Sequence, residues 1–84
     1  MSKRIVLIGA GSAMFGLSTL GDIFQCEALA GSTLVLFDID EEALRKVEAT
    51  TRGFIATENL PFQLIATTSR KEALSNADFC IISI

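Results

Sequence analysis

Four short, mostly apolar runs recur along the chain and predict four strands. They cover residues 4–9, 33–38, 62–67 and 78–84. Apolar runs of this length, rich in β-branched residues and without strict polar alternation, are typical of strands buried on both faces, as in a parallel sheet. Each pair of successive runs is separated by a segment with helical signals, so strands and helices alternate along the chain.

A helix is predicted over residues 13–28, between the first two runs. Ser12 fits its N-cap, because a serine hydroxyl can accept a hydrogen bond from a free amide of the first turn. Gly16 and Gly21 lower the helix propensity by about 1 kcal/mol each relative to alanine. We expect these two glycines to permit close packing of the helix on the sheet.

Two further helices are predicted over residues 41–59 and 70–76. Asp40 fits the N-cap of the longer helix, and the residue before Pro61 is biased away from helix, which sets its end. Ser69 and the glutamate three residues later form the pattern of a capping box at the start of the short helix. The alternation of elements predicts right-handed crossovers and an α/β fold.

The fold class follows from this alternation. We predict a partial Rossmann fold, a parallel sheet of four strands in the order 3-2-1-4 with flanking helices. The last predicted strand reaches residue 84, and no helix follows it to cover that side of the sheet. We therefore expect residues 1–84 to be the N-terminal part of a larger domain.

A glycine-rich turn joins the first strand to the first helix and predicts a phosphate-binding site. Gly9 allows a tight turn, and Gly11, which lacks a Cβ, lets a pyrophosphate approach the backbone closely. The amides of Ser12, Ala13 and Met14 would point at the phosphates from the positive end of the helix. Met14 stands where the general dinucleotide fingerprint has its third glycine.

An acid and an apolar residue after the second strand complete the pattern. The Asp38 carboxylate can accept hydrogen bonds from both ribose hydroxyls of an adenosine and would repel a 2′-phosphate, which favours NAD over NADP. Ile39 could cover one face of the adenine. Ser83 and Ile84 lie at the carboxyl end of the fourth predicted strand, at the edge where ligands bind in open α/β sheets. The predicted NAD-binding residues are Gly9, Gly11, Ser12, Ala13, Met14, Phe15, Asp38, Ile39 and Ser83.

Composition excludes several other classes of site. The chain has no histidine, so no His-based triad and no His metal ligand lies within these 84 residues. Its net charge of −3 argues against nucleic acid as a partner, and it has no uninterrupted apolar stretch of 18 residues, so no membrane span is expected. Cys26 and Cys80 show no metal-binding spacing, and we interpret them as small buried apolar residues in a reducing, cytoplasmic compartment.

Specific runs carry a resemblance to a known family. GAGSAMFG at residues 9–16, LGDIF at 20–24, LFDID at 36–40 and KEALSNADF at 71–79 resemble the N-terminus of glycoside hydrolase family 4. The resemblance covers essentially the whole chain and is greatest to the α-galactosidase and α-glucosidase branch. Members have a phenylalanine three residues after the serine of the glycine turn, which Phe15 matches. Met14 also agrees with the family.

The resemblance implies an enzyme that hydrolyses α-glycosides with NAD and a divalent metal, usually manganese, in place of two catalytic carboxylates. The implied route is oxidation of the sugar at C3, removal of the C2 proton, elimination of the glycosidic oxygen, addition of water and return of the hydride. The family's metal ligands, a Cys and a His, would lie beyond residue 84, because Cys26 and Cys80 do not match that Cys. The catalytic residues would lie there too.

The implied parent is a full-length homo-oligomer that acts on a small-molecule glycoside. In that parent the present chain would be the first part of the NAD-binding Rossmann domain. The rest of that domain and the catalytic, metal-binding domain would lie outside residues 1–84. The 84 residues alone would then be inactive.

Three other functions share parts of the pattern. A lactate/malate-type NAD-dependent dehydrogenase has the same strand, glycine turn and acid, but more often carries glycine at position 14. A non-catalytic nucleotide-sensing module should close its own sheet. A methyltransferase can combine a similar glycine loop with an acid.

Overall fold

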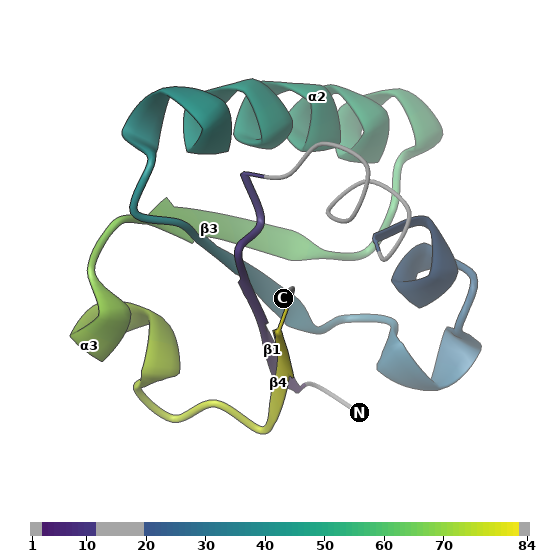
Figure 1. Cartoon of the computed structure of the whole chain (residues 1–84). Helices are drawn as coiled ribbons and strands as arrows, with labels where there is room; N and C mark the ends of the chain where they lie inside the picture. Colours follow the sequence, from purple (N-terminus) through teal and green to yellow (C-terminus); the bar gives the residue numbers. More distant parts are fainter. Residues whose placement is uncertain (1–2, 12–19, 83–84) are drawn as a thin grey trace.

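The computed structural model describes residues 3–11 and 20–82 as a parallel sheet with helices on both faces (Figure 1). The sheet order is β3-β2-β1-β4, as predicted, and the described part of each strand falls within its predicted run. The strands are β1 (Arg4–Ile8), β2 (Thr33–Phe37), β3 (Gln63–Thr67) and β4 (Phe79–Ile82). Residues 83–84 of the last predicted strand lie outside the described residues.

Strand register divides the apolar residues between the two faces of the sheet. Val6 of β1 pairs with Val35 of β2 on one side and with Cys80 of β4 on the other. Side chains at paired positions of parallel strands point to the same face, and neighbours along a strand point to opposite faces. Val6 and its neighbour Leu7 are both fully buried, so the central strand β1 is covered on both faces.

One face of the sheet is covered by α2 (Glu41–Glu58) and by the helical residues 20–24. Figure 1 shows α2 running across this face. Its buried residues Leu44, Val47 and Thr51 recur at helical spacing and so lie on one face of the helix. The main core on this face contains Ile5, Leu7, Ala10, Leu20, Ile23, Leu34, Leu36, Leu44, Val47, Phe62 and Leu64.

Both ends of α2 are set by the residues that the sequence indicated. The Ala43 amide donates to Asp40 Oδ1 over 3.1 Å, which makes Asp40 the N-cap. Asn59 adopts a left-handed conformation with φ 51°, and the Leu60 amide donates back to the Ile55 carbonyl over 3.0 Å. Pro61 follows and cannot continue the helix.

The short helix α3 (Arg70–Leu74) lies on the opposite face of the sheet. Its Ala73 is fully buried in a second, smaller core with Val6, Val35 and Phe37. Ser69 caps the helix, since its hydroxyl accepts a 3.2 Å hydrogen bond from the amide three residues on. The other bond of the predicted capping box is replaced, because the Ser69 amide donates to a threonine hydroxyl at the end of β3.

The helix predicted over residues 13–28 ends earlier than expected. Helical residues 20–24 are followed by a turn and by η1 (Glu27–Leu29), a 3₁₀ helix. Cys26 separates the two with an extended backbone, φ −90° and ψ 105°. Its amide bonds to the Ile23 carbonyl three residues back, so the regular α-helical pattern is already lost there. Residues 12–19, where the start was predicted, lie outside the described part.

Both cysteines are exposed, so the prediction that they are buried was wrong. Cys26 lies in the turn before η1. Cys80 shares the face of Val6, but α3, the helix on that face, packs on β2 and β3. The sequence shows that β4 is apolar. The sequence does not show how far α3, the helix on the face of Cys80, extends toward β4.

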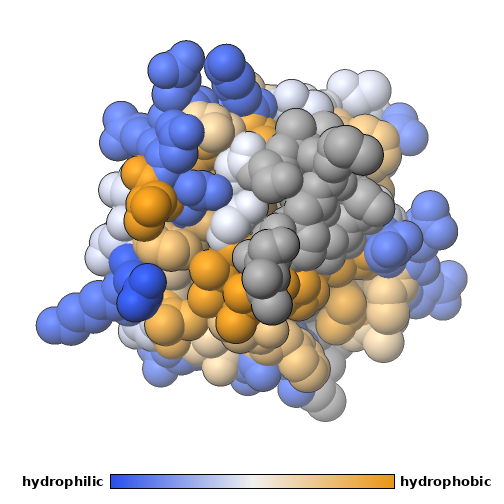
Figure 2. All heavy atoms as spheres, viewed as in Figure 1, coloured by the Kyte–Doolittle hydropathy of each residue, from blue (hydrophilic) through white to orange (hydrophobic). Residues whose placement is uncertain are grey.

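Strand β4 keeps large apolar side chains in contact with solvent. Phe79 is 50% exposed and Ile82 is 59% exposed. In contrast, Ile5 of β1, which pairs with Phe79, is only 2% exposed. Figure 2 shows apolar surface gathered in the region where Figure 1 places β1 and β4. This side of the sheet is therefore an apolar surface in the described structure.

Candidate cofactor-binding site

The candidate site is built where β1 and β2 end side by side. Ile8 pairs with Phe37, so Gly9 and Asp38 leave the sheet at the same edge. The amides of Gly9 and Ala10 both donate to the Phe37 carbonyl, over 2.9 and 3.1 Å. Gly9 has φ 84°, a conformation that favours glycine. The glycine turn is thus tied by backbone hydrogen bonds to the strand that carries the acid.

The Asp38 carboxylate accepts hydrogen bonds from two backbone amides. Oδ2 accepts from the Gly11 amide and Oδ1 accepts from the Asp40 amide, both over 2.9 Å. These bonds orient the carboxylate between the glycine turn and the start of α2. Each carboxylate oxygen can accept more than one hydrogen bond, so capacity for ribose hydroxyls remains.

Gly11 packs so closely that no side chain fits at its position. A Cβ there would lie 2.7 Å from Asp38 Oδ2 and 3.0 Å from the Ala43 Cβ. Gly11 was predicted from the sequence to let a pyrophosphate approach the backbone, and these two contacts are a second reason for glycine at this position. Sequence reasoning missed Ala43, because a helix alanine next to a glycine turn carries no motif.

Ile39 extends from the same edge into solvent. Its exposed fraction is 83%, the highest among the exposed large apolar residues of the described chain. A single exposed aliphatic side chain is ordinary on a protein surface. Ile39 lies directly after Asp38, where an adenine-covering role was predicted for it, and an apolar side chain of this exposure is compatible with that prediction.

The structure brings four of the predicted site residues to one edge of the sheet. These are Gly9, Gly11, Asp38 and Ile39. The other predicted residues lie outside the described part of the chain: Ser12, Ala13, Met14, Phe15 and Ser83. The binding role of all nine residues stays a prediction.

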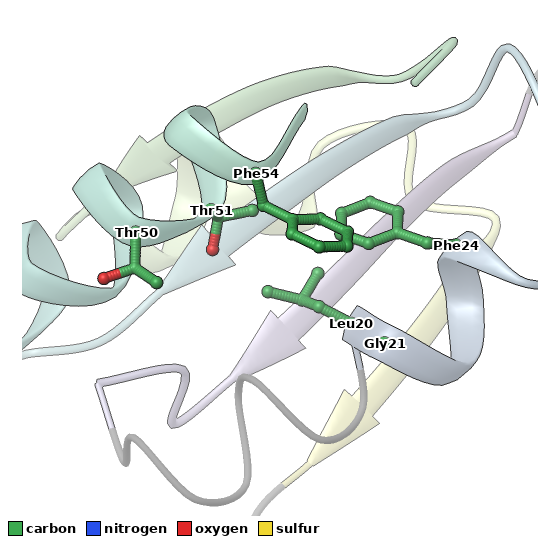
Figure 3. Close-up of a pocket in the computed structure, with 6 residues that line it drawn as sticks. All are labelled: Leu20, Gly21, Phe24, Thr50, Thr51 and Phe54. Atoms are coloured by element: carbon green, nitrogen blue, oxygen red, sulfur yellow. The ribbon is translucent and has the colours of Figure 1, made fainter. Parts of the chain in front are cut away.

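A separate apolar groove lies between residues 20–24 and the second half of α2 (Figure 3). The Phe24 and Phe54 rings stack with their centroids 5.6 Å apart, and Phe24 also meets Phe62 edge-on at 5.1 Å. Thr51 borders the groove, and its hydroxyl donates to the Val47 carbonyl within α2. None of the described residues that line it is charged, which distinguishes this groove chemically from the Asp38 edge.

The described residues contain neither a metal-binding cluster nor a membrane-spanning helix. No group of three or more Cys, Asp or Glu side chains among residues 3–11 and 20–82 is arranged to hold a metal ion. Within the same ranges, no helix combines the length and apolar character needed to cross a bilayer.

Comparison with known proteins decides the family. The family described as Family 4 glycosyl hydrolase matches residues 4–84. The chain belongs to glycoside hydrolase family 4. This confirms the resemblance that the glycine turn and the LFDID run indicated. The α/β sheet of this chain is therefore that of a glycosidase family.

Relatives of the family 4 chain include two named glycosidases. An α-glucosidase from Erwinia rhapontici is 56% identical over 84 residues, which is 100% of this chain and 18% of the relative. An α-galactosidase from Bacillus subtilis (strain 168) is 35% identical over 82 residues, 98% of this chain and 19% of the relative. The family 4 chain therefore spans about a fifth of the length of these proteins.

Solved structures share its fold. A 6-phospho-α-glucosidase from gut microorganisms, in complex with NAD and glucose 6-phosphate, is 30% identical with a TM-score of 0.86. A 6-phospho-α-glucosidase from gut microorganisms in complex with NAD and Mn²⁺ has the same TM-score at 21% identity and shows the fold alone. Each comparison covers 100% of this chain and 19% of the other, and together they confirm the predicted Rossmann-like sheet.

Proposed function

We propose that the chain is the N-terminal, NAD-binding part of a longer family 4 glycosidase that cleaves α-glucosides. One observation carries the proposal: the glycine turn after β1 and the Asp38 carboxylate after β2 meet at one edge of the sheet, 2.9 Å apart at Gly11. Family membership and the 56% identity to an α-glucosidase support the reaction class. The chain's coverage of about a fifth of its relatives supports its place within a longer protein.

The residues of this edge fit NAD. Gly11 presents a backbone without a Cβ at a position that a Cβ would fill, and the Asp38 carboxylate is held beside it by two amides. Asp38 would accept hydrogen bonds from the adenosine ribose, while Ile39 would cover the adenine. Ser12, Ala13 and Met14 would bind the pyrophosphate through their amides, with Phe15 and Ser83 at the edges of the site.

NAD supplies a hydride acceptor that makes a transient oxidation of the sugar at C3 possible, which acidifies the C2 proton for elimination. This chain's contribution would be to bind and orient the cofactor, and no catalytic residue is assigned within it. We place the manganese ligands outside residues 1–84. The family resemblance supports a Cys and a His as those ligands, and the chain has no histidine.

Three glycosides are candidate substrates of the full-length enzyme. The higher identity to an α-glucosidase than to an α-galactosidase favours a glucoside over a galactoside. The likeness to a solved 6-phospho-α-glucosidase makes a phosphorylated glucoside the second candidate. We further propose that the full-length enzyme is a cytoplasmic homo-oligomer that acts on small glycosides and binds neither nucleic acid nor membrane.

The test uses the full-length protein that carries this chain. It is incubated with p-nitrophenyl α-glucoside, p-nitrophenyl α-galactoside and the 6-phosphate of the glucoside, with and without NAD and Mn²⁺. Nitrophenol and NADH are followed together. The expected result is nitrophenol release from the α-glucoside that needs both additives, with no net NADH.

Other outcomes separate the alternatives. NADH formed in proportion to substrate, without cleavage of the glycoside, would indicate a dehydrogenase and contradict the proposed hydrolysis. Nitrophenol release that needs neither additive would contradict the cofactor part of the proposal. Release from the galactoside or the phosphorylated glucoside alone would keep the reaction class and replace the substrate.

A further inference from the structure

We infer that Gly11 is a positioning residue for the Asp38 carboxylate and that, through this carboxylate, it sets the preference for NAD over NADP. The inference rests on the proposed NAD-binding function. It differs from the pyrophosphate role of the glycine turn, because it assigns Gly11 to the ribose end of the cofactor. It starts from the 2.9 Å hydrogen bond that the Gly11 amide donates to Asp38 Oδ2.

The same contact limits the size of residue 11. A Cβ at this position would lie 2.7 Å from Asp38 Oδ2 and 3.0 Å from the Ala43 Cβ. A separation below 3.0 Å is not sustained, so one of the neighbours must move. Gly11 therefore brings the amide close to the carboxylate without the side chain that would displace it.

The carboxylate is the neighbour that can move. Ala43 lies in the first turn of α2, where its amide is bonded to Asp40 and the next residue, Leu44, is fully buried against the sheet. A shift of Ala43 would disturb this packing. The Asp38 side chain can instead rotate away, because within the described residues its carboxylate is held by two hydrogen bonds, from the Gly11 and Asp40 amides.

Rotation of Asp38 changes the affinities for the two cofactors in opposite directions. The carboxylate would lose its fixed place for the ribose hydroxyls, so NAD binds more weakly. It would also move away from the position of a 2′-phosphate, so the repulsion of NADP falls. A role limited to pyrophosphate would behave differently, because NAD and NADP share the pyrophosphate and would lose affinity equally.

The experiment is a double-mutant cycle in the full-length protein. Dissociation constants for NAD and for NADP are measured by calorimetry for the wild type, Gly11→Ala, Asp38→Ala and Gly11→Ala/Asp38→Ala. Gly53→Ala is the matched control, because a Cβ at Gly53 meets nothing within 4 Å. Circular dichroism checks that each variant is folded.

We expect Asp38→Ala to weaken NAD binding and to narrow the preference over NADP. Gly11→Ala should reduce the NAD-to-NADP preference by about tenfold, the size expected for loss of a charge-assisted hydrogen bond. In the Asp38→Ala background the same change should leave the preference unaltered. Gly53→Ala should leave both affinities at their wild-type values.

Equal loss of NAD and NADP affinity in Gly11→Ala would overturn the inference in favour of a pyrophosphate role. A change in preference that persists without Asp38 would also overturn it. If Gly11→Ala does not fold, Gly11→Ala/Ala43→Gly removes the 3.0 Å contact with Ala43 and keeps the contact with Asp38, so the same comparison applies. A wild-type protein that binds neither cofactor would contradict the proposed function itself.

Discussion

Glu48 joins two arginines on the exposed side of α2. Its Oε1 lies 2.8 Å from Arg45 Nη1, and its Oε2 lies 2.8 Å from Arg52 Nη2. The hydrogen bond from Arg45 is the main cause that lowers the pKa of Glu48 below its ordinary value of 4.5, and Arg52 lowers it further. Because the charged form is favoured in the folded chain, this carboxylate stabilises the fold when it is ionised.

The sign of the pH dependence follows. The stabilisation is fully present above the unfolded pKa and is lost as the pH falls through the lowered folded pKa. We expect Glu48→Gln to reduce the free energy of unfolding by about 0.5 kcal/mol at pH 7, since the pairs are solvent-screened. The difference from wild type should shrink below pH 4.5. Urea titrations of the dilute chain across this pH range test it, and a constant difference down to pH 2 would contradict it.

At the scale of single residues, Gly11 and the cysteines show which features a sequence motif can predict and which it cannot. The glycine turn and Asp38 could be predicted as one site, because parallel strands end at a common edge. The contact of Gly11 with Ala43 could not, since it depends on how the first turn of α2 packs against the turn after β1. The exposure of Cys80 likewise depends on its neighbours in the sheet.

At the scale of elements, α2 ends in a conformation that few residues tolerate. Asn59 has φ 51° and ψ 49°, and its amide completes the last turn by bonding to carbonyls of the helix. Asparagine and glycine adopt this region readily, whereas a β-branched residue is strained there. The end of α2 is therefore sensitive to the identity of one exposed residue.

We expect Asn59→Val to lower the free energy of unfolding by about 1–2 kcal/mol, the cost of a left-handed conformation for a β-branched side chain. Asn59→Gly should stay within about 0.5 kcal/mol of wild type. Glu58→Val is the matched control, because Glu58 is exposed and helical, so its loss should be limited to the small difference in helix propensity. Equal losses at positions 58 and 59, measured by urea unfolding, would contradict the prediction.

The elements differ in how well local sequence predicted them. The strands carry short apolar runs, α2 carries a capping residue and is followed by a proline, and the described bounds of these elements agree with the predicted ranges within a few residues. The segment around Cys26 carries no such signal. Its helix gives way to a turn and η1, and no glycine or proline marks the change.

At the scale of the whole molecule, β4 and its neighbours expose an apolar surface. Phe79 and Ile82 are at least half exposed, and β4 pairs with β1 on one side. Apolar strands that are not covered promote association with other chains. The main core, in contrast, joins residues of β1, β2, β3 and α2 that are buried from solvent.

We expect the isolated 84-residue chain to self-associate through this surface. Sedimentation velocity should show association that increases with protein concentration. Ile82→Lys should raise the concentration at which half of the chains are associated by about tenfold. Ile39→Lys is the matched control, because Ile39 is also an exposed isoleucine, at 83%, but it follows β2 and is not part of the β4 surface. A wild-type chain that stays a monodisperse monomer at every concentration tested would contradict the prediction.

The sequence by itself determined the alternation of strands and helices, the strand order and the pairing of a glycine turn with an acid. It could do so because these features depend on local periodicity, on capping residues and on the few connections that a parallel sheet permits. The family also followed from short runs of residues.

Only the tertiary structure decided which atoms meet. It placed the Gly11 amide on Asp38, brought Ala43 against the same glycine, exposed Cys80 and left part of β4 in contact with solvent. These features arise from packing between segments far apart in the chain. Packing of this kind depends on distances and coverage that no local pattern of residues encodes.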